Sequence, residues 1–380
     1  MKEQKKVVVA NQPSWLLEND SISCYVTELG GHMAPVVFEK NSSSPIRPYF
    51  ISPWQNEQLS VDGPVLIPLR GDFFCLPFGE HNDYQGEHHA VHGEPAGSPW
   101  TFVELVDQAD LHELHLTQAN TQRKGSVEKR VWLKDGQSVV YVQHVVNGFA
   151  GKTTLGHHAT LHGEQTWLIS TAPIQFGMVT PDMAPHTNRE YISLLPGARF
   201  TDLRAVPTLW KTVETSDCSI FPNRLGFVDI AQVYFQPRTE PAWTCAVNQE
   251  QGYVWFTLKD MKVLPSMVLW MENHGRHGSP WNGRNCCIGL EDVCAYFAQG
   301  LVPSAEVNPV NLAGIPTTHT LREDIPFAVN YIEGVARIPA GFGKVADVQF
   351  GSGEVTFVDE AGLAFSTKVE YEFIFTGTVK

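Results

Sequence analysis

Short apolar or β-branched runs recur along the whole chain, separated by Gly, Pro, Asn, Asp and Ser. In the first part of the chain they return about every ten residues, which is typical of a β-sandwich or barrel. The run at 112–117, His-Glu-Leu-His-Leu-Thr, alternates as a strand with one buried face does. The pattern therefore predicts an all-β fold. The predicted strands are 7–10, 21–27, 33–39, 101–106, 112–117, 129–134, 138–147, 226–235, 243–247, 253–258, 267–271, 285–290, 317–321, 328–332, 345–350, 354–358 and 367–375.

Helical periodicity is scarce along this sequence. Only 198–206 and 291–298 fit one or two helical turns. No shift in composition marks a domain boundary, and the 31 glycines and 25 prolines fall between the apolar runs as turn residues. We expect a single domain over 1–380, with 340–380 adding a few strands to the same body.

Composition narrows the function classes. A chain of 380 residues with 43% hydrophobic and 18% charged residues is globular rather than disordered. The net charge of −14 argues against nucleic acid or an anionic membrane as a partner. The apolar run at 7–10 is shorter than the roughly seven to fifteen residues of a signal peptide. Seven cysteines without framework spacing favour a reducing compartment, so we expect a cytoplasmic protein.

The stretch 69–100 is the densest in titratable side chains. It carries Arg70 and the histidines His81, His88, His89 and His92, placed between aromatic residues and glycines. Glycines let a backbone bend and approach a ligand closely. This composition indicates the wall of a site rather than a core strand.

A second histidine group, His157, His158 and His162, follows in mid-chain. If this segment is a strand, His158 and His162 share one face and His157 lies on the other. Each histidine taken alone is more often a hydrogen-bonded core or surface residue than a catalytic one. Two groups in one chain favour a site, because imidazole suits proton transfer near neutral pH.

Glu291 is the main candidate for a general base. It shares strand parity with Cys287 and Gly289 and ends an otherwise apolar run. A carboxylate delivered into a low-dielectric pocket could take a proton, although a solvent-exposed or salt-bridged strand end explains the pattern about as well. Tryptophans that could stack on a sugar ring, or simply pack, are Trp54, Trp100, Trp270 and Trp281.

Metal and cofactor signals are weak. His88, His89, His92 and Glu94 could converge on zinc, but the spacing is nonspecific and the chain has no His-x-His. It also lacks a G-x-S-x-G nucleophile motif and the glycine-rich phosphate-binding motifs. We expect no metal and no cofactor.

Several short motifs, taken in order, resemble the aldose 1-epimerase (galactose mutarotase) superfamily, nearest its hexose-phosphate mutarotase-like branch. The family's Arg-Gly motif and the His-Gly motif that follows it are similar to Arg70-Gly71 and His92-Gly93. The family's mid-chain histidine strand is similar to 155–163, LGHHATLHG.

Later motifs extend the resemblance. The family's substrate-binding aspartate before a strand with Tyr is similar to Asp229 in FVDIAQVYF. Its catalytic glutamate, near a Cys and after a Trp-containing strand, is similar to Glu291 in CCIGLED, which follows MVLWMEN. The resemblance implies the large antiparallel β-supersandwich of mutarotases.

It also implies a reaction, the interconversion of sugar anomers by ring opening and closure. Glu291 would take the proton of the anomeric hydroxyl, His158 would protonate the ring oxygen, and His92 would hydrogen-bond the developing charge. Arg70 and Asp229 would hold hydroxyls of the sugar. In addition, Trp270 is expected to contact the sugar, and His157 is the rival of His158 because a one-residue shift in register exchanges them.

One departure concerns the substrate. Where the branch that acts on sugar phosphates has Phe-Ala-Arg after His-Gly, this chain has Glu94-Pro95-Ala96. The phosphate-binding arginine is missing and a glutamate would repel phosphate, so we expect a free sugar. The segment GRHGSPWNGR at 275–284 has no counterpart in the family pattern.

Two alternatives stay open. The same sandwich could bind carbohydrate without chemistry, or His88–Glu94 could serve a metal-dependent sugar isomerase or lyase. The sequence names neither the sugar nor the oligomeric state.

Overall fold

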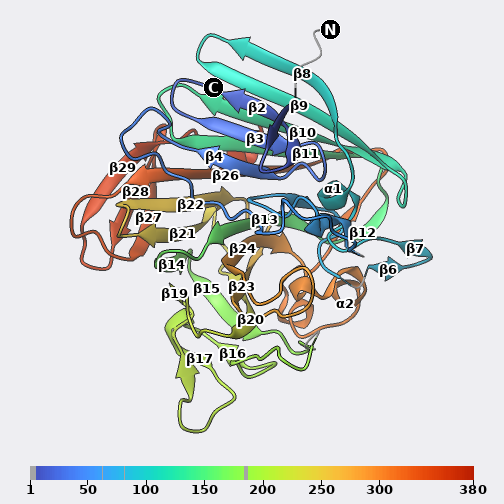
Figure 1. The fold of residues 1–380 in the computed structure, drawn as a ribbon, viewed down its shortest axis with the longest axis vertical. Helices are drawn as coiled ribbons and strands as arrows, with labels where there is room; N and C mark the ends of the chain where they lie inside the picture. The colour runs from blue at the N-terminus through green and yellow to red at the C-terminus, as the bar shows by residue number, and fades with distance from the viewer. Residues whose placement is uncertain (1–5, 62, 81, 184–186) are drawn as a thin grey trace.

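The structure is a computed structural model that describes residues 6–61, 63–80, 82–183 and 187–380. His81, one of the predicted histidine group, lies outside the described residues. Two large antiparallel sheets form the body, the larger in the upper part of Figure 1 and the smaller below it. The all-β prediction is confirmed.

Within the described residues the larger sheet has nine strands. Their order is β19 (Ile220–Phe221), β14 (Trp167–Thr171), β21 (Ala242–Asn248), β22 (Tyr253–Lys259), β26 (Phe327–Arg337), β11 (Val139–Asn147), β10 (Gly125–Lys134), β9 (Leu111–Asn120) and β8 (Thr101–Gln108).

The smaller sheet has seven strands in the same described part. Their order is β16 (Arg199–Phe200), β15 (Ile174–Val179), β20 (Phe227–Phe235), β23 (Ser266–Asn273), β24 (Cys286–Cys294), β13 (Leu155–His162) and β5 (Phe74–Cys75).

Smaller elements surround these sheets. An N-terminal sheet contains β1 (Val7–Val9), β2 (Gln12–Glu18), β3 (Ser23–Thr27) and β4 (Met33–Val37). A C-terminal sheet contains β27 (Val345–Gly351), β28 (Glu354–Asp359) and β29 (Ala364–Lys368). Short pairs and helices complete the fold: β6 (Asp83–Tyr84) with β7 (Glu87–His88), β12 (Gly151–Thr153) with β25 (His319–Leu321), β17 (Val206–Pro207) with β18 (Thr215–Ser216), α1 (Glu94–Gly97), α2 (Leu301–Ala305) and α3 (Phe373–Thr376).

The seven-stranded sheet has two chemically different faces, because successive strand residues point to opposite sides. On β24, Ile288 and Leu290 belong to the main hydrophobic cluster between the large sheets, whereas Cys287 and Val293 belong to a second cluster on the other side. We call these the inner and outer faces of the sheet. Each side chain of the central strands therefore faces either the hydrophobic core between the two large sheets or the opposite, outer side.

The inner face also carries buried charges, and most of them are paired. The Asp292 carboxylate lies 2.7 Å from Lys259 Nζ and accepts hydrogen bonds from Thr257 Oγ1 (2.7 Å) and Tyr331 Oη (2.8 Å). His157 Nδ1 lies 2.8 Å from Asp72 Oδ2. Burying charge is costly unless it is paired, and the contacts of Asp292 tie β24 to β22 and β26 of the opposite sheet.

Most predicted strands are present, but the predictions for 291–298 and 367–375 are wrong and the one for 198–206 is confirmed only in part. Residues 291–298 do not form helical turns: Glu291 lies within β24, which continues to Cys294, and only 297–299 make a 3₁₀ turn. The 198–206 segment holds β16 and one 3₁₀ turn. The last predicted strand, 367–375, is the end of β29 followed by α3. The predictions missed β2, β14 and β15.

The C-terminal strands pack on the main body. Val345 and Phe357 belong to the same hydrophobic cluster as the large sheets, and α3 contacts β26.

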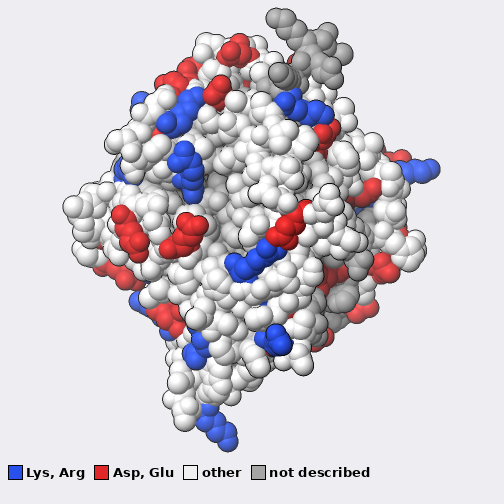
Figure 2. All heavy atoms as spheres, viewed as in Figure 1, with Lys and Arg blue, Asp and Glu red and all other residues white. Residues whose placement is uncertain are grey.

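All seven cysteines have free thiols. Among the described residues no helix has the length and apolarity needed to cross a membrane. Acidic and basic side chains are interspersed on the face in Figure 2, which shows no continuous basic patch.

Gly71 provides a test of the packing between the N-terminal sheet and the body. Its φ is +52°, and a Cβ there would lie 1.9 Å from the Met33 carbonyl oxygen. We expect Gly71→Ala to lower the free energy of unfolding by roughly 2–4 kcal/mol, because both backbone strain and a backbone clash oppose it. Urea denaturation measures the change.

Gly86 gives the matched control. Its φ is +87° but no atom of the described residues lies within 4 Å of the added Cβ, so Gly86→Ala isolates the strain of about 1 kcal/mol. Equal losses in the two variants would contradict the packing explanation.

Candidate functional site

A cavity of about 470 Å³ lies against the outer face of the seven-stranded sheet. Strand residues form one side of its lining, and loops and a 3₁₀ turn supply the rest; the strand residues are His158, Ile230, Val268, Trp270 and Glu291. Its volume is within the usual range for small-molecule sites. The loop residues used below are Phe73, Glu80, His92, Glu190, Arg276 and Trp281.

His158 and Glu291 meet at the wall of this cavity. They are direct cross-strand partners on β13 and β24, and His158 Nε2 lies 3.2 Å from Glu291 Oε1. Gly289, on the same face, leaves room for the carboxylate, since a Cβ there would lie 2.4 Å from Glu291 Oε1. Two of the predicted catalytic residues are therefore a contacting acid–base pair.

Burial determines the charge preference of this pair. Desolvation raises the pKa of Glu291 well above 4.5, although the positive charge of Arg276 acts in the opposite direction. Desolvation, with neighbouring His92, lowers the pKa of His158 well below 6.5. Both effects favour neutral groups, so between these two pKa values the pair holds a single proton.

His92 lies beside this pair in a constrained backbone. Its ring is 5.1 Å from that of His158, and its φ of +60° is in the left-handed region. The Gly79 N–H donates to His92 Nδ1 (3.3 Å), which leaves Nε2 as the protonated nitrogen of the neutral ring. Desolvation and Arg276 lower the pKa of His92 to about 4. His92 is thus a neutral hydrogen-bond donor at physiological pH.

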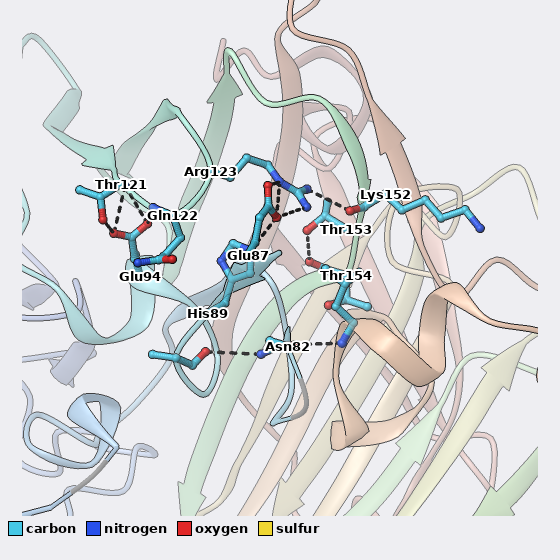
Figure 3. A network of polar contacts seen from close by, with 12 residues as sticks. Asn82, Glu87, His89, Glu94, Thr121, Gln122, Arg123, Lys152, Thr153 and Thr154 are labelled. Atoms are coloured by element: carbon cyan, nitrogen blue, oxygen red, sulfur yellow. Dashed lines mark hydrogen bonds and ion pairs between the residues drawn. The ribbon is translucent and has the colours of Figure 1, made fainter. Parts of the chain in front are cut away.

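The segment before and after His92 is fastened to the β9–β10 turn (Figure 3). Glu94 accepts hydrogen bonds from the backbone of Thr121 and Gln122 at 2.9–3.2 Å. Glu87 pairs with Arg123, with Nη2 to Oε2 at 2.6 Å, and also lies 2.9 Å from His89 Nε2. These contacts lie on both sides of His92 along the chain and hold its segment in place.

The predicted metal cluster is not assembled. His89 and Glu94 turn to the partners just described, and exposed His88 pairs with Asp83, while His92 lines the cavity. Across the described part of the chain, no three His, Cys, Asp or Glu side chains are placed to hold a metal ion. Glu94 also does not line the cavity, so the predicted repulsion of a sugar phosphate by this residue is not supported.

Arg70 is not placed as the sequence predicted. It is buried and donates to the carbonyl oxygens of Pro68 (3.0 Å), Val9 (3.0 Å) and Ala10 (2.9 Å), and also to Gln55 Oε1. It does not line the cavity. The Arg-Gly motif therefore fastens the N-terminal β1–β2 hairpin to the body, and a sugar-binding role for Arg70 is not supported.

Neither Asp229 nor His157 lines the cavity, and the reason is the same for both. Each is on the inner parity of its strand, whereas neighbouring Ile230 and His158 face the cavity. The Asp229 carboxylate accepts hydrogen bonds from Ser193 N (2.7 Å) and Leu194 N (3.0 Å). His157 is fully buried beside Asp72. The structure thus resolves the His157–His158 alternative in favour of His158 as the residue at the cavity.

Trp270 occupies the position at the cavity that the sequence predicted. It lies edge-on to Trp281, with ring centroids 5.4 Å apart. Its buried Nε1 has no hydrogen-bond partner among the described residues. Trp54 and Trp100 are packing residues, since their indole nitrogens donate to backbone carbonyls of Leu66 and Pro95.

The segment 275–284 has a role at the cavity that was not predicted from the sequence. It carries Arg276 and Trp281 to the cavity and is held by carboxylates. Glu272 Oε1 accepts from Arg276 N (3.0 Å), and Glu190 Oε1 accepts from His277 N (2.9 Å). Its unusual density of Arg, Trp and Gly was the available signal.

No protein-family model matches the chain, and no curated protein matches its sequence. Solved structures do match. A galactose mutarotase-like protein from Clostridium acetobutylicum has a TM-score of 0.57 and 9% identity, covering 88% of this chain and 98% of that one. A candidate aldose 1-epimerase from Escherichia coli K12 has a TM-score of 0.56 and 12% identity, covering 86% and 100%. A candidate mutarotase from Salmonella typhimurium has a TM-score of 0.54 and 10% identity, covering 87% and 93%.

These likenesses confirm the predicted fold, that of the galactose mutarotase-like proteins. Identities near one residue in ten carry no residue roles with them.

The structural role of Arg70 can be tested by stability. We expect Arg70→Met to lower the free energy of unfolding by roughly 2–4 kcal/mol, because buried carbonyl oxygens lose a charged donor. Arg322→Met, at an exposed ion pair with Asp324, should change it by less than about 0.5 kcal/mol. If Arg70→Met kept the wild-type free energy of unfolding but no longer bound sugar, the result would support Arg70 as a sugar-binding residue instead.

Proposed function

We propose that this chain, with its galactose mutarotase-like fold, interconverts the α and β anomers of an aldose or related sugar. The observation that carries the proposal is the contact of His158 Nε2 with Glu291 Oε1 at 3.2 Å on a cavity wall. Anomer exchange requires one group that takes a proton from the anomeric hydroxyl and one that gives a proton to the ring oxygen. A buried imidazole–carboxyl pair supplies both without a cofactor.

The reaction proceeds as follows. Glu291 takes the proton of the C1 hydroxyl while His158 gives a proton to the ring oxygen, and the C1–O5 bond breaks with its electrons going to oxygen. The open-chain aldehyde rotates about the C1–C2 bond. The C5 hydroxyl then attacks the other face of the aldehyde, and both proton transfers reverse. His92 donates a hydrogen bond to the oxygen on which negative charge develops.

The proton inventory of the pair matches this scheme. Burial raises the pKa of Glu291 and lowers that of His158, so it favours the single proton on Glu291. Transfer of this proton along the 3.2 Å contact to His158 produces the carboxylate and imidazolium that the scheme uses. The positive charge of Arg276 favours this transfer, because it lowers the pKa of Glu291. The assignment of the base to Glu291 and of the acid to His158 requires this transfer, because burial by itself favours a protonated Glu291 and a neutral His158.

The aromatic part of the lining suits a sugar ring. Trp270 and Trp281 present apolar faces on which the C–H groups of a pyranose can pack. A sugar hydroxyl can accept the hydrogen bond of the Trp270 indole N–H, which has no partner among the described residues.

The cytoplasmic location expected from the cysteine content stays a prediction.

The assignment of Glu291 is tested by removing its charge. We expect Glu291→Gln to lower kcat/KM for anomer exchange by about 10²-fold or more, since an amide cannot accept the proton. Saturation-transfer NMR of the α and β anomeric protons of glucose and galactose measures the rate.

Glu250→Gln is the control, because Glu250 is exposed in the turn between β21 and β22 and does not line the cavity. Full activity of Glu291→Gln would refute the mechanism. Sugar binding by the wild type with no exchange above the spontaneous rate would favour the carbohydrate-binding alternative.

The pH dependence follows from the lowered histidine pKa values. His92 should titrate at about 4 and His158 well below 6.5, so both stay neutral as pH falls through 6.5. Activity should be lost only when the pair gains a second proton, which places the acid limb of kcat/KM well below 6.5. Imidazole NMR titration and rate measurements check this together, and an acid limb at pH 6.5 that follows a His158 titration would contradict it.

A further inference from the structure

The catalytic cavity adjoins a second one. The second cavity, about 790 Å³, is bounded by α2, the β6 region and the outer end of β20. Both cavities are lined by the same five residues at their junction, Glu80, Glu190, Ile230, Arg276 and Ala298. The two cavities therefore adjoin each other along these side chains, and we call them together the cleft.

Only the first part of this cleft holds the acid–base pair. His92, His158, Trp270 and Glu291 line the first cavity and not the second. A sugar that reacts must place its C1 and ring oxygen beside His158 and Glu291. A unit of the same substrate that reaches the second cavity must therefore be attached at a position other than C1.

The second cavity combines apolar surface with carboxylates. Met183, Ile192, Val228, Val302 and Pro303 provide apolar lining. Its charged lining residues in the described chain are Glu80, Asp83, Asp182 and Glu190 against the single guanidinium of Arg276. This excess of negative charge opposes a phosphate or carboxylate group. Carboxylate oxygens do accept hydrogen bonds from hydroxyl groups, and apolar side chains pack on sugar C–H surfaces.

We propose that the substrate is a neutral reducing oligosaccharide, with its reducing unit in the first cavity and the next glycosyl unit in the second. This inference rests on the proposed function, because only a free reducing end can change anomer. The contacts of the second unit are remote from the reacting atoms and raise kcat/KM through binding energy.

The test compares sugars that share a reducing unit. Anomer exchange is measured by saturation-transfer NMR for glucose and for its reducing disaccharides maltose, cellobiose and lactose. We expect at least one disaccharide to exceed glucose in kcat/KM by about tenfold or more. Glucose 6-phosphate should be a poorer substrate than that disaccharide.

Variants in the second cavity make the test specific. Val302→Trp fills this cavity from α2, and we expect it to bring the disaccharide-to-glucose ratio of kcat/KM to about one. Val307→Trp, at a position 79% exposed, adds the same side chain outside the cleft and should keep the wild-type ratio. Should Val302→Trp fail to fold, Asp182→Lys at the exposed rim is expected to lower the ratio as well.

The outcomes separate this inference from the proposed function. Exchange of glucose with no disaccharide preference, or a folded Val302→Trp with the wild-type ratio, overturns the inference and leaves the function standing. Preference for glucose 6-phosphate overturns the neutral class of substrate. No exchange with any sugar defeats the proposed function and this inference with it.

Discussion

The candidate site depends on the register of β13 against β24. In this register His158 is opposite Glu291 and His157 is opposite Asp292. A slip of one residue would move every side chain of a strand to the other face, so His157 would replace His158 at the cavity. The contact between imidazole and carboxyl thus requires one register, and the contacts on the inner face help to fix it.

Those inner contacts are unusual in a core, because they bury charged side chains. Lys259 and Asp292 are fully buried, and Asp292 also bonds Thr257 on β22 and Tyr331 on β26. A buried ion pair of this kind contributes little net stability compared with apolar packing, since desolvation offsets the attraction. It penalises alternatives instead, because a shifted strand would leave a charge unpaired at a cost of about 3–5 kcal/mol. In this fold the pairing gives the central strands a unique register, on which the outer face depends.

The fold was largely predictable because its signal is local. Alternation and turn residues identified most strands, including those of the C-terminal sheet. Strand β13 was ambiguous, because its histidines are adjacent and parity alone does not say which face meets a cavity. Glu291 was expected at a strand end because the polar pair Glu291-Asp292 looks like a strand boundary. It lies inside β24 instead, where each of the two carboxylates has its own partner.

The errors at the site have a different origin, since they concern contacts between segments far apart in the chain. Arg70 bonds carbonyl groups about 60 residues earlier, and Asp229 bonds a loop about 35 residues earlier. Nothing near either residue in the sequence encodes those partners. The same holds for Arg276, which reaches the cavity because Glu272 and Glu190 hold the insertion that carries it. Arg276 is also the charge that lowers the pKa of both Glu291 and His92. It therefore opposes the effect of burial at Glu291 and adds to the effect of burial at His92, so the 275–284 segment contributes to the proton balance of both side chains.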